Sequence, residues 1–319
     1  MTAPGPVTPV ADAVQQGIVP TLAELVALRA QVLRAAQPRR GRHGIHGPAP
    51  SSLRGRGMEY AESREYVAGD DVRRMDWRLT ARTGRAHTKL FQAERERLTL
   101  LVADTAPALY FGTRVRFKSV QAARAGAVAV WAALQAGDRI AALRGGEPAV
   151  PPAGGLRGAM RVLDALVRWY ARPQGEDAGL AVALEHAQRL LRPGAQLVVL
   201  ADAHAAAQVP AVRWTALARA HQATLVLLQD PLETAPPARE LAFLAGARRV
   251  QLGLDRAGVR ARWDEAMLGP ARALAQALPG QGWTVRLLSS DAPSADWLRP
   301  HGSDPHGVAD AGLAVAAAD

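Results

Sequence analysis

The amino-acid sequence predicts an α/β protein with a doubly wound, mostly parallel sheet, preceded by an N-terminal helix and an ordered charged arm. Three observations carry this prediction. Short apolar runs of the kind found in buried strands occur at residues 98–103, 197–200 and 225–228. Amphipathic segments with helical spacing lie between them. Strand and helix alternating at this spacing is typical of parallel βαβ units.

The N-terminal part begins with a helix at about residues 21–36. Thr21 and Glu24 have the spacing of a capping box, and leucine and valine then recur at helical intervals. Residues 37–52 are rich in arginine, glycine, histidine and proline, which predicts a loop. Residues 53–95 are polar and charged with scattered aromatics, too irregular for a long helix. We therefore expect an ordered arm there.

The sheet domain begins with the strand at 98–103 and continues with helices at about 117–136, 156–171, 178–191 and 211–221. In the last third, residues 249–253 and 259–263 flank a turn-like segment and predict a hairpin, followed by a helix at 264–278 and a strand at 283–288. The predicted division is an N-terminal part at 1–95, an α/β domain at 96–300 and a flexible tail at 301–319.

Composition narrows the class of protein. The chain has 319 residues, of which 49% are hydrophobic, and no cysteine. The absence of cysteine excludes disulfides, thiolate metal sites and a cysteine nucleophile. The opening residues lack the features of a secretory signal, and no apolar stretch reaches transmembrane length. We therefore expect a cytoplasmic protein with no membrane span.

A formal net charge of +10 raises nucleic acid as a partner. The basic residues are mostly arginines spread along the chain, and the densest group has no interleaved aromatics to stack on bases. A nucleic-acid-binding protein is therefore one alternative, but we expect no specific nucleic-acid partner. The residues of this basic group are Arg34, Arg39, Arg40, Arg42, His43, Arg54 and Arg56.

Residues 112–119 nearly match a phosphate-binding loop between a strand and a helix. Such a loop needs glycine before its lysine so that backbone N–H groups can wrap the phosphates, and Phe117 precedes Lys118 instead. The segment therefore predicts an ordinary loop leading into a helix.

The most informative segment is 64–82, in which arginine, aspartate, glycine and two aromatics follow a fixed spacing. It resembles the signature R-x-Y-x-x-G-D-D-x-R-x-I-D-W-x-x-x-A-R of the domain of unknown function 58 family. The resemblance covers about residues 50–300 and implies an α/β domain of von Willebrand factor A type after the signature. The residues that match are Arg64, Tyr66, Gly69, Asp70, Asp71, Arg73, Asp76, Trp77, Ala81 and Arg82, with Met75 as a conservative departure.

Two interpretations of the signature remain open. Its interleaved aspartates and arginines, with one tyrosine and one tryptophan, are suited to ion pairs that would lock the arm onto the sheet domain, with Asp76 and Arg82 in one network. The same residues are also suited to form a docking surface for a partner. The binding or arm network would comprise Arg64, Tyr66, Asp70, Asp71, Arg73, Asp76, Trp77 and Arg82.

The resemblance also implies a metal-ion-dependent adhesion site at the carboxyl ends of the strands, built from D-x-S-x-S, a threonine and a second aspartate. Magnesium suits such an oxygen shell. Asp104 and Asp202 stand at two of these positions, but both serine hydroxyls and the threonine are missing, and Thr105 and Asp177 lie off the family spacing. We expect a degenerate metal site with no bound cofactor, in which both aspartates cap helices or accept backbone hydrogen bonds.

The resemblance further implies a protein-binding adaptor or chaperone-like accessory protein that works with a MoxR-type AAA+ ATPase in the maturation or remodelling of other protein complexes. We expect no enzyme activity, because no nucleophile and base are found at catalytic spacing. The enzymatic alternative is a metal-dependent hydrolase or phosphotransferase that uses Asp104 and Asp202.

Overall fold

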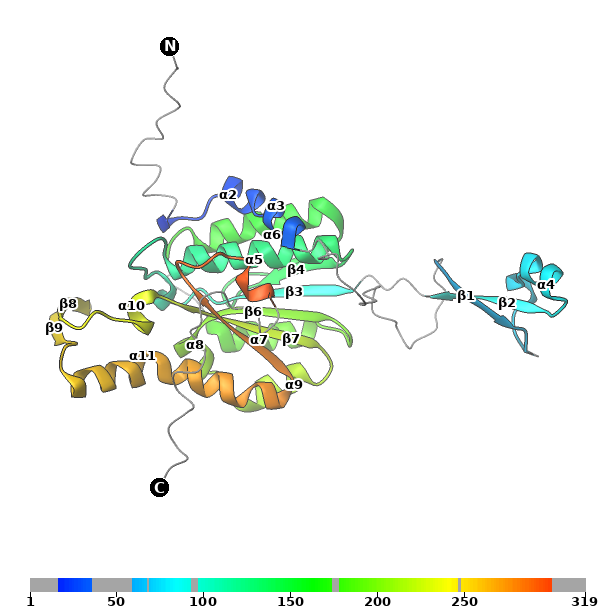
Figure 1. Cartoon of the computed structure of the whole chain (residues 1–319). Helices are drawn as coiled ribbons and strands as arrows, with labels where there is room; N and C mark the ends of the chain where they lie inside the picture. Colours follow the sequence, from blue (N-terminus) through cyan, green and yellow to red (C-terminus); the bar gives the residue numbers. More distant parts are fainter. Residues whose placement is uncertain are drawn as a thin grey trace, which may run out of the picture. The chain divides into compact units, whose positions relative to one another are not determined.

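The computed structural model describes residues 17–35, 59–67, 69–92, 97–173, 178–245 and 248–299. Contacts within the chain divide it into two compact units, one formed by residues 1–37 together with 98–319 and the other by residues 38–97. Figure 1 labels most of the helices and strands of both units. The predicted tail at 301–319 lies outside the described residues.

The larger unit is built on a six-stranded sheet whose strands are mostly parallel. β3 (Leu98–Ala103) lies at the centre, between β6 (Gln196–Asp202) and β4 (Arg139–Leu143). β7 (Gln222–Gln229) and β10 (Trp283–Ser289) extend one side. β5 (Val150–Ala153) closes the other side and is the one antiparallel member among the described strands of this sheet. The predicted α/β class is therefore confirmed.

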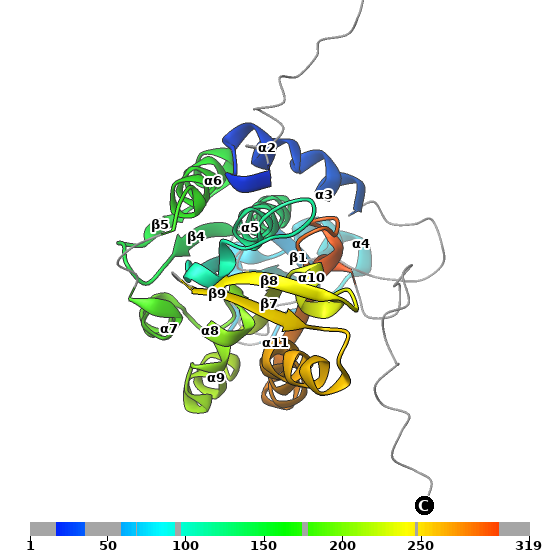
Figure 2. The same ribbon diagram turned by 90° about the vertical axis from the view of Figure 1, so that its left-hand side faces the viewer.

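Helices cover both faces of this sheet, because its strands are apolar on both sides. Leu101 and Ala103 pack under α5 (Lys118–Gln135) and α6 (Gly155–Tyr170). Leu100 and Val102 face the layer of α7 (Gly179–Leu190), α8 (Ala203–Ala207), α9 (Ala211–Ala218) and α11 (Ala257–Ala277). Figure 2 shows the two helical layers on opposite sides of the sheet.

The predicted first helix is present but divided into α2 (Leu22–Ala27) and α3 (Arg29–Ala35). Thr21 accepts a hydrogen bond from the backbone N–H of Glu24, as expected of a cap. Within α2, the carbonyl oxygen of Leu25 accepts a hydrogen bond from Trp131 Nε1 on α5 over 2.9 Å. Both short helices contact the α/β unit through α5 and α6. This differs from the sequence-based division at residues 95 and 96, which grouped the helix with the arm.

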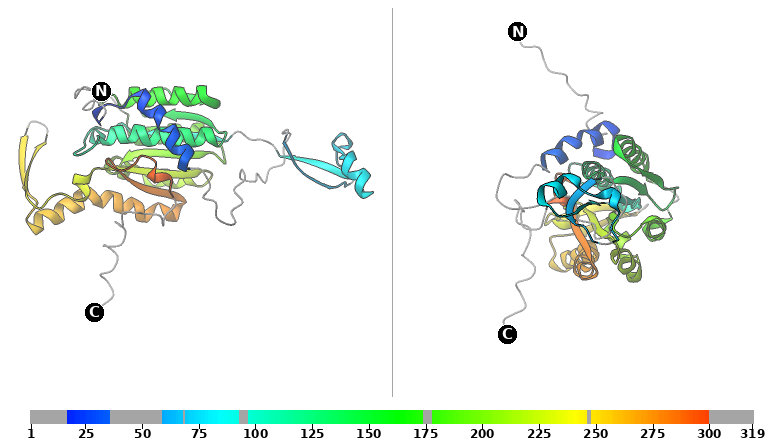
Figure 3. Two further views of the ribbon diagram at one scale, coloured as in Figure 1. Left: turned by 45° about the horizontal axis from the view of Figure 1, so that its top comes forward. Right: turned by 90° about the vertical axis from the view of Figure 1, so that its right-hand side faces the viewer.

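The predicted hairpin of 249–253 with 259–263 is wrong. β9 (Arg248–Gly253) pairs with β8 (Glu240–Ala245), and α11 begins at Ala257. Trp263 lies on the helix and packs against Phe243 of the hairpin, with ring centroids 5.3 Å apart. Val259 and Trp263 are four residues apart and therefore share one face of this helix. Figure 3 shows the β8–β9 hairpin beside the first turns of α11.

The smaller unit is a two-stranded antiparallel sheet whose strands are joined through a short helix. β1 (Glu59–Glu65) pairs with β2 (His87–Gln92), and the connection carries the 3-10 turn η1 (Val72–Arg74) and α4 (Trp77–Thr83). Asp76 caps the N-terminus of α4, and Gly84 ends it with φ of 73°. The arm predicted at 53–95 is ordered where the structure describes it.

Among the described residues, no helix has the length and apolar character needed to cross a bilayer.

Candidate functional site

The carboxyl ends of β3 and β6 bring Asp104 and Asp202 together. The backbone N–H of Asp202 donates to Asp104 Oδ2 over 3.0 Å, and the N–H of Ala106 donates to Asp104 Oδ1 over 3.0 Å. Asp202 caps α8 through the N–H of His204, 2.9 Å from its Oδ1. Both aspartates are buried. Asp104 thus accepts backbone hydrogen bonds, and Asp202 caps a helix.

A lysine that sequence reasoning did not connect with these aspartates occupies the same end of the sheet. Lys118, the first residue of α5, is only 2% exposed. Its Nζ lies 2.7 Å from Asp202 Oδ2 and 2.6 Å from Glu233 Oε1. The ammonium group therefore bridges two carboxylates that lie far apart in the sequence. We call Lys118, Asp202 and Glu233 the buried triad.

The charges of the buried triad stabilise one another. Burial alone lowers the pKa of Lys118, but the neighbouring carboxylates outweigh this effect and raise the pKa above its usual value. Burial alone raises the pKa of Asp202, but the Lys118 ammonium outweighs it, so the pKa of Asp202 is lowered. Both groups therefore stay charged across the neutral pH range.

A further buried carboxylate, Asp230, follows the end of β7 and supports the triad. Asp230 and Glu233 form a capping box on α10 (Pro231–Thr234), in which Glu233 Oε2 accepts from the Asp230 N–H over 2.8 Å. Asp230 also accepts hydrogen bonds from the hydroxyls of Thr113 and Ser290 over 2.5 and 2.8 Å. Glu233 is thus held with one oxygen on Lys118 and the other on the backbone.

The residues at this edge do not fit a divalent metal. Each carboxylate oxygen of Asp104, Asp202 and Glu233 already accepts a hydrogen bond, and the Lys118 ammonium supplies the positive charge. Thr105, considered as a substitute ligand, is approached by Arg144 Nη1 at 3.4 Å. Within the described ranges, no three acidic or histidine side chains are grouped to hold a metal ion. Asp177 lies outside these ranges.

The segment 112–119 is an ordered turn whose lysine points inward. Phe117 is the N-cap residue of α5, and its N–H donates to the carbonyl oxygen of Gly17 over 2.8 Å. A side chain at Gly112 would come within 2.3 Å of the Arg116 carbonyl oxygen, so the backbone is tightly folded on itself. With its ammonium group held by Asp202 and Glu233, Lys118 is committed to the protein interior.

The signature residues gather on the smaller unit. Arg64 Nη2 lies 2.6 Å from Asp70 Oδ1, and Arg74 Nε lies 4.0 Å from Asp71 Oδ2. The backbone N–H of Tyr66 donates to the Ala86 carbonyl oxygen over 2.8 Å. These interactions hold the connection between β1 and β2, so part of the signature has a structural role within its own unit.

Asp76 and Arg82, which the sequence suggests in one network, are not paired with each other among the described side chains. Asp76 accepts from the N–H of Leu79 over 3.0 Å and from the hydroxyl of Ser63 over 2.9 Å. These hydrogen bonds lower the pKa of Asp76. Arg82, in contrast, has no ion pair or hydrogen bond within the described part of the chain. Asp76 therefore acts as a helix cap, a role its position before Trp77 could have suggested.

The remaining sequence-based candidates are placed as follows. Arg73 is exposed on η1, and Trp77 is 64% exposed at the start of α4. The basic group considered for nucleic acid, namely the side chains of Arg34, Arg39, Arg40, Arg42, His43, Arg54 and Arg56, lies outside the described residues.

Comparison with known proteins gives one family and three similar curated sequences. The model of the family described as "Protein of unknown function DUF58" matches residues 62–269. Uncharacterized protein Mb1516 of Mycobacterium bovis and Uncharacterized proteins MT1527 and Rv1480 of two Mycobacterium tuberculosis strains are each 32% identical over 200 residues. The match covers 60% of this chain and 62% of each relative, so it spans less than two thirds of their length.

Proposed function

Since the chain belongs to the DUF58 family of proteins of unknown function, we propose that it is a protein-binding adaptor whose sheet domain works without a divalent cation. The observation that carries the metal independence is the buried triad, whereas the binding role follows from the family resemblance. Lys118 places a positive charge, stabilised by two carboxylates, at the strand ends where a metal-dependent adhesion site would hold its ion. In such a domain, the charge at the strand ends would be the same whether or not magnesium is present.

The finer fold assignment, a von Willebrand factor A type of doubly wound sheet, is part of the proposal. It is supported by Asp104 and Asp202 at adjacent strand ends and by helices on both faces of the sheet. The family resemblance adds the partner class, a MoxR-type AAA+ ATPase that remodels or matures other protein complexes. Such an adaptor would act in the cytoplasm, where ATP is available.

The enzymatic alternative has less support. A metal-dependent hydrolase or phosphotransferase would need open carboxylate oxygens on Asp104 and Asp202 to hold its ion. Those oxygens accept hydrogen bonds from the backbone and from Lys118. We therefore propose binding and no catalysis for this edge of the sheet.

The proposal is tested by co-purification. The tagged full-length chain is isolated from its own cells in magnesium-containing buffer, and its partners are quantified by mass spectrometry against an untagged control. We expect a AAA+ ATPase to be enriched, and absence of any such ATPase would contradict the partner class. Metal independence is tested on the isolated chain, because a AAA+ ATPase itself binds ATP together with magnesium. Thermal melts of the isolated chain with magnesium and with EDTA should superimpose, and a rise in Tm with magnesium would contradict metal independence.

A further inference from the structure

We infer that the exposed face of η1 and α4 docks an acidic protein segment, an inference that rests on the proposed binding function and names the chemistry of the partner. We call this surface the signature face. It consists of Val72, Arg73, Trp77, Arg78, Ala81 and Arg82, all of which are exposed.

Helical spacing places these side chains together. Trp77 and Ala81 are four residues apart on α4, as are Arg78 and Arg82, so the two rows lie side by side. The opposite side of the helix faces the sheet, since Thr80 Oγ1 accepts a hydrogen bond from the His87 N–H over 3.0 Å. Trp77, Arg78, Ala81 and Arg82 lie on the exposed part of the helix.

The signature face exposes two large apolar side chains. Trp77 is 64% exposed and Val72 is 57% exposed. Burying a large side chain of this kind is worth roughly 1.5–3 kcal/mol. Tryptophan and arginine are also the residues that most often dominate protein–protein interfaces. The face thus offers an anchor that the small unit does not use for its own core.

The charged part of the face carries an excess of arginine. Residues 72–82 contain four arginines and one aspartate, and that aspartate, Asp76, is committed to Leu79 and Ser63. Arg73, Arg78 and Arg82 have no ion-pair partner among the residues that the structure describes. Like charges four residues apart destabilise a helix, so carboxylates from a partner would relieve this repulsion. The face is therefore complementary to an acidic surface.

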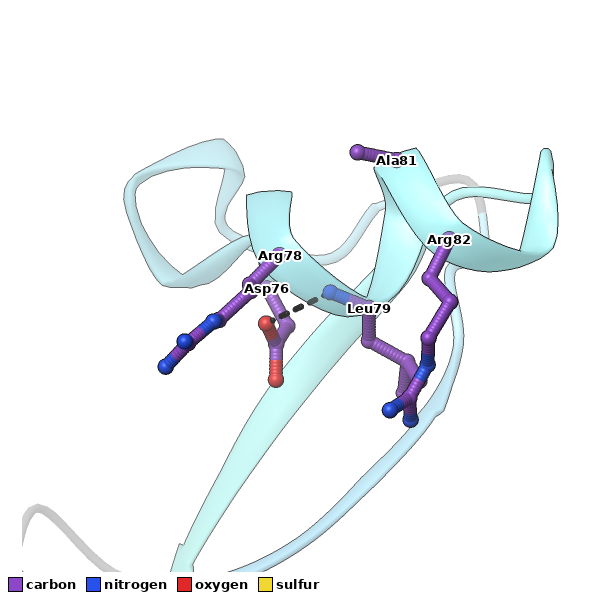
Figure 4. A pocket seen from close by; sticks show the side chains of 5 residues that line it. All are labelled: Asp76, Arg78, Leu79, Ala81 and Arg82. Atoms are coloured by element: carbon purple, nitrogen blue, oxygen red, sulfur yellow. Dashed lines mark hydrogen bonds between the residues drawn. The ribbon is translucent and has the colours of Figure 1, made fainter.

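The surface beside these arginines is hollowed. A depression of about 500 Å³ is lined by Asp76, Arg78, Leu79, Ala81 and Arg82. Figure 4 shows the side chains of Arg78 and Arg82 on either side of Asp76, with Asp76 bonded to the Leu79 N–H. Two guanidinium groups flanking a hollow can each take a carboxylate in a paired geometry.

An acidic protein segment fits this face better than nucleic acid does. A nucleic-acid groove needs a continuous basic track and several aromatics for stacking. On the described part of the small unit, Trp77 is the one strongly exposed aromatic. One exposed indole beside three arginines offers an anchor for a short protein segment, but no row of aromatics on which successive bases could stack.

The test uses the full chain and a fluorescein-labelled synthetic peptide of mixed glutamate, aspartate and leucine, with binding followed by fluorescence anisotropy. A peptide with glutamine and asparagine in place of the acids controls for charge, and a single-stranded DNA oligonucleotide tests the alternative. The variants are Arg78→Glu/Arg82→Glu and Trp77→Ala. The matched control is Arg157→Glu/Arg161→Glu, another exposed pair four residues apart, on α6.

We expect the acidic peptide to bind the wild type, and the Arg78→Glu/Arg82→Glu and Trp77→Ala changes each to weaken binding by about tenfold or more. The control pair on α6 should leave binding within about twofold of wild type. Equal binding by all variants, no binding by the wild type, or tighter binding of the oligonucleotide that is lost in the same variants would overturn the inference. The peptide experiment contains no ATPase, so it tests the docking surface separately from the adaptor function. If the peptide does not bind but a AAA+ ATPase still co-purifies, the signature face is not the docking surface, and the adaptor function is unaffected.

Discussion

Replacing Lys118 by methionine should be among the most damaging single changes in this protein. Methionine has a similar length but no charge, so Lys118→Met leaves Asp202 and Glu233 without their shared cation. The Asp202 side chain is 3% exposed and cannot turn to water, whereas that of Glu233 is 15% exposed. Breaking a buried pair by removing one partner typically costs about 3–5 kcal/mol. Because the free energy of unfolding of a domain is only about 5–15 kcal/mol, the variant should retain little of its stability.

Urea denaturation followed by circular dichroism measures this cost. The second variant of the experiment is Asp202→Asn, and the third combines both changes. Since the neutral amide introduced by Asp202→Asn needs no counter-charge, the combined variant should recover about 2 kcal/mol or more relative to the sum of the single costs. Arg157→Met, which removes an exposed arginine from α6, should change stability by no more than about 0.5 kcal/mol.

The reasoning would be refuted by a Lys118→Met protein that loses less than about 1 kcal/mol with an unchanged denaturant slope. It would also be refuted by single costs that simply add in the combined variant, since additive costs mean that the two residues do not interact.

Three further predictions follow from individual residues. Equilibrium dialysis should detect no saturable ATP binding at residues 112–119, because Lys118 is bound to Asp202 and Glu233; saturable binding would contradict this. Asp76→Ala should reduce hydrogen-exchange protection of α4 by about fivefold through loss of its cap, whereas Arg82→Ala should leave protection unchanged; equal effects would restore the paired network. Burial lowers the pKa of His221, so its contribution to stability is complete above the unfolded pKa of about 6.5 and is lost as the pH falls toward the folded pKa. Urea midpoints at about pH 7.5 and 5.5 should therefore differ less in His221→Gln than in wild type, and an unchanged difference would contradict this assignment.

The central part of the fold was predictable because its strands are strongly apolar on both faces. The runs at 98–103, 197–200 and 225–228 fall within β3, β6 and β7. β4 and β5 were not anticipated. β4 contains two alanines, which weaken its apolar signal, and β5 contains two prolines, which are tolerated only because it is an edge strand.

The candidate site was predictable only in part, because its members meet through the tertiary fold. Asp104 and Asp202 follow recognisable strands, so their proximity could be inferred from the order of a parallel sheet. Lys118 was noticed only as part of an imperfect phosphate-binding loop. Its partner Glu233 is 115 residues away, and nothing in the local pattern of either residue indicates the other. The contact of the buried lysine with these two carboxylates can be recognised only in the three-dimensional structure.

The most direct test of the central claim compares thermal melts of the wild-type chain in magnesium and in EDTA. If the Lys118 ammonium supplies the charge at the strand ends, magnesium has no binding position, and melts with about 1 mM Mg²⁺ and with EDTA should superimpose. If magnesium did bind, a concentration of about ten times its dissociation constant would stabilise the folded protein by about 1.4 kcal/mol. A rise of several degrees in Tm with magnesium that disappears in Asp104→Ala would contradict the account.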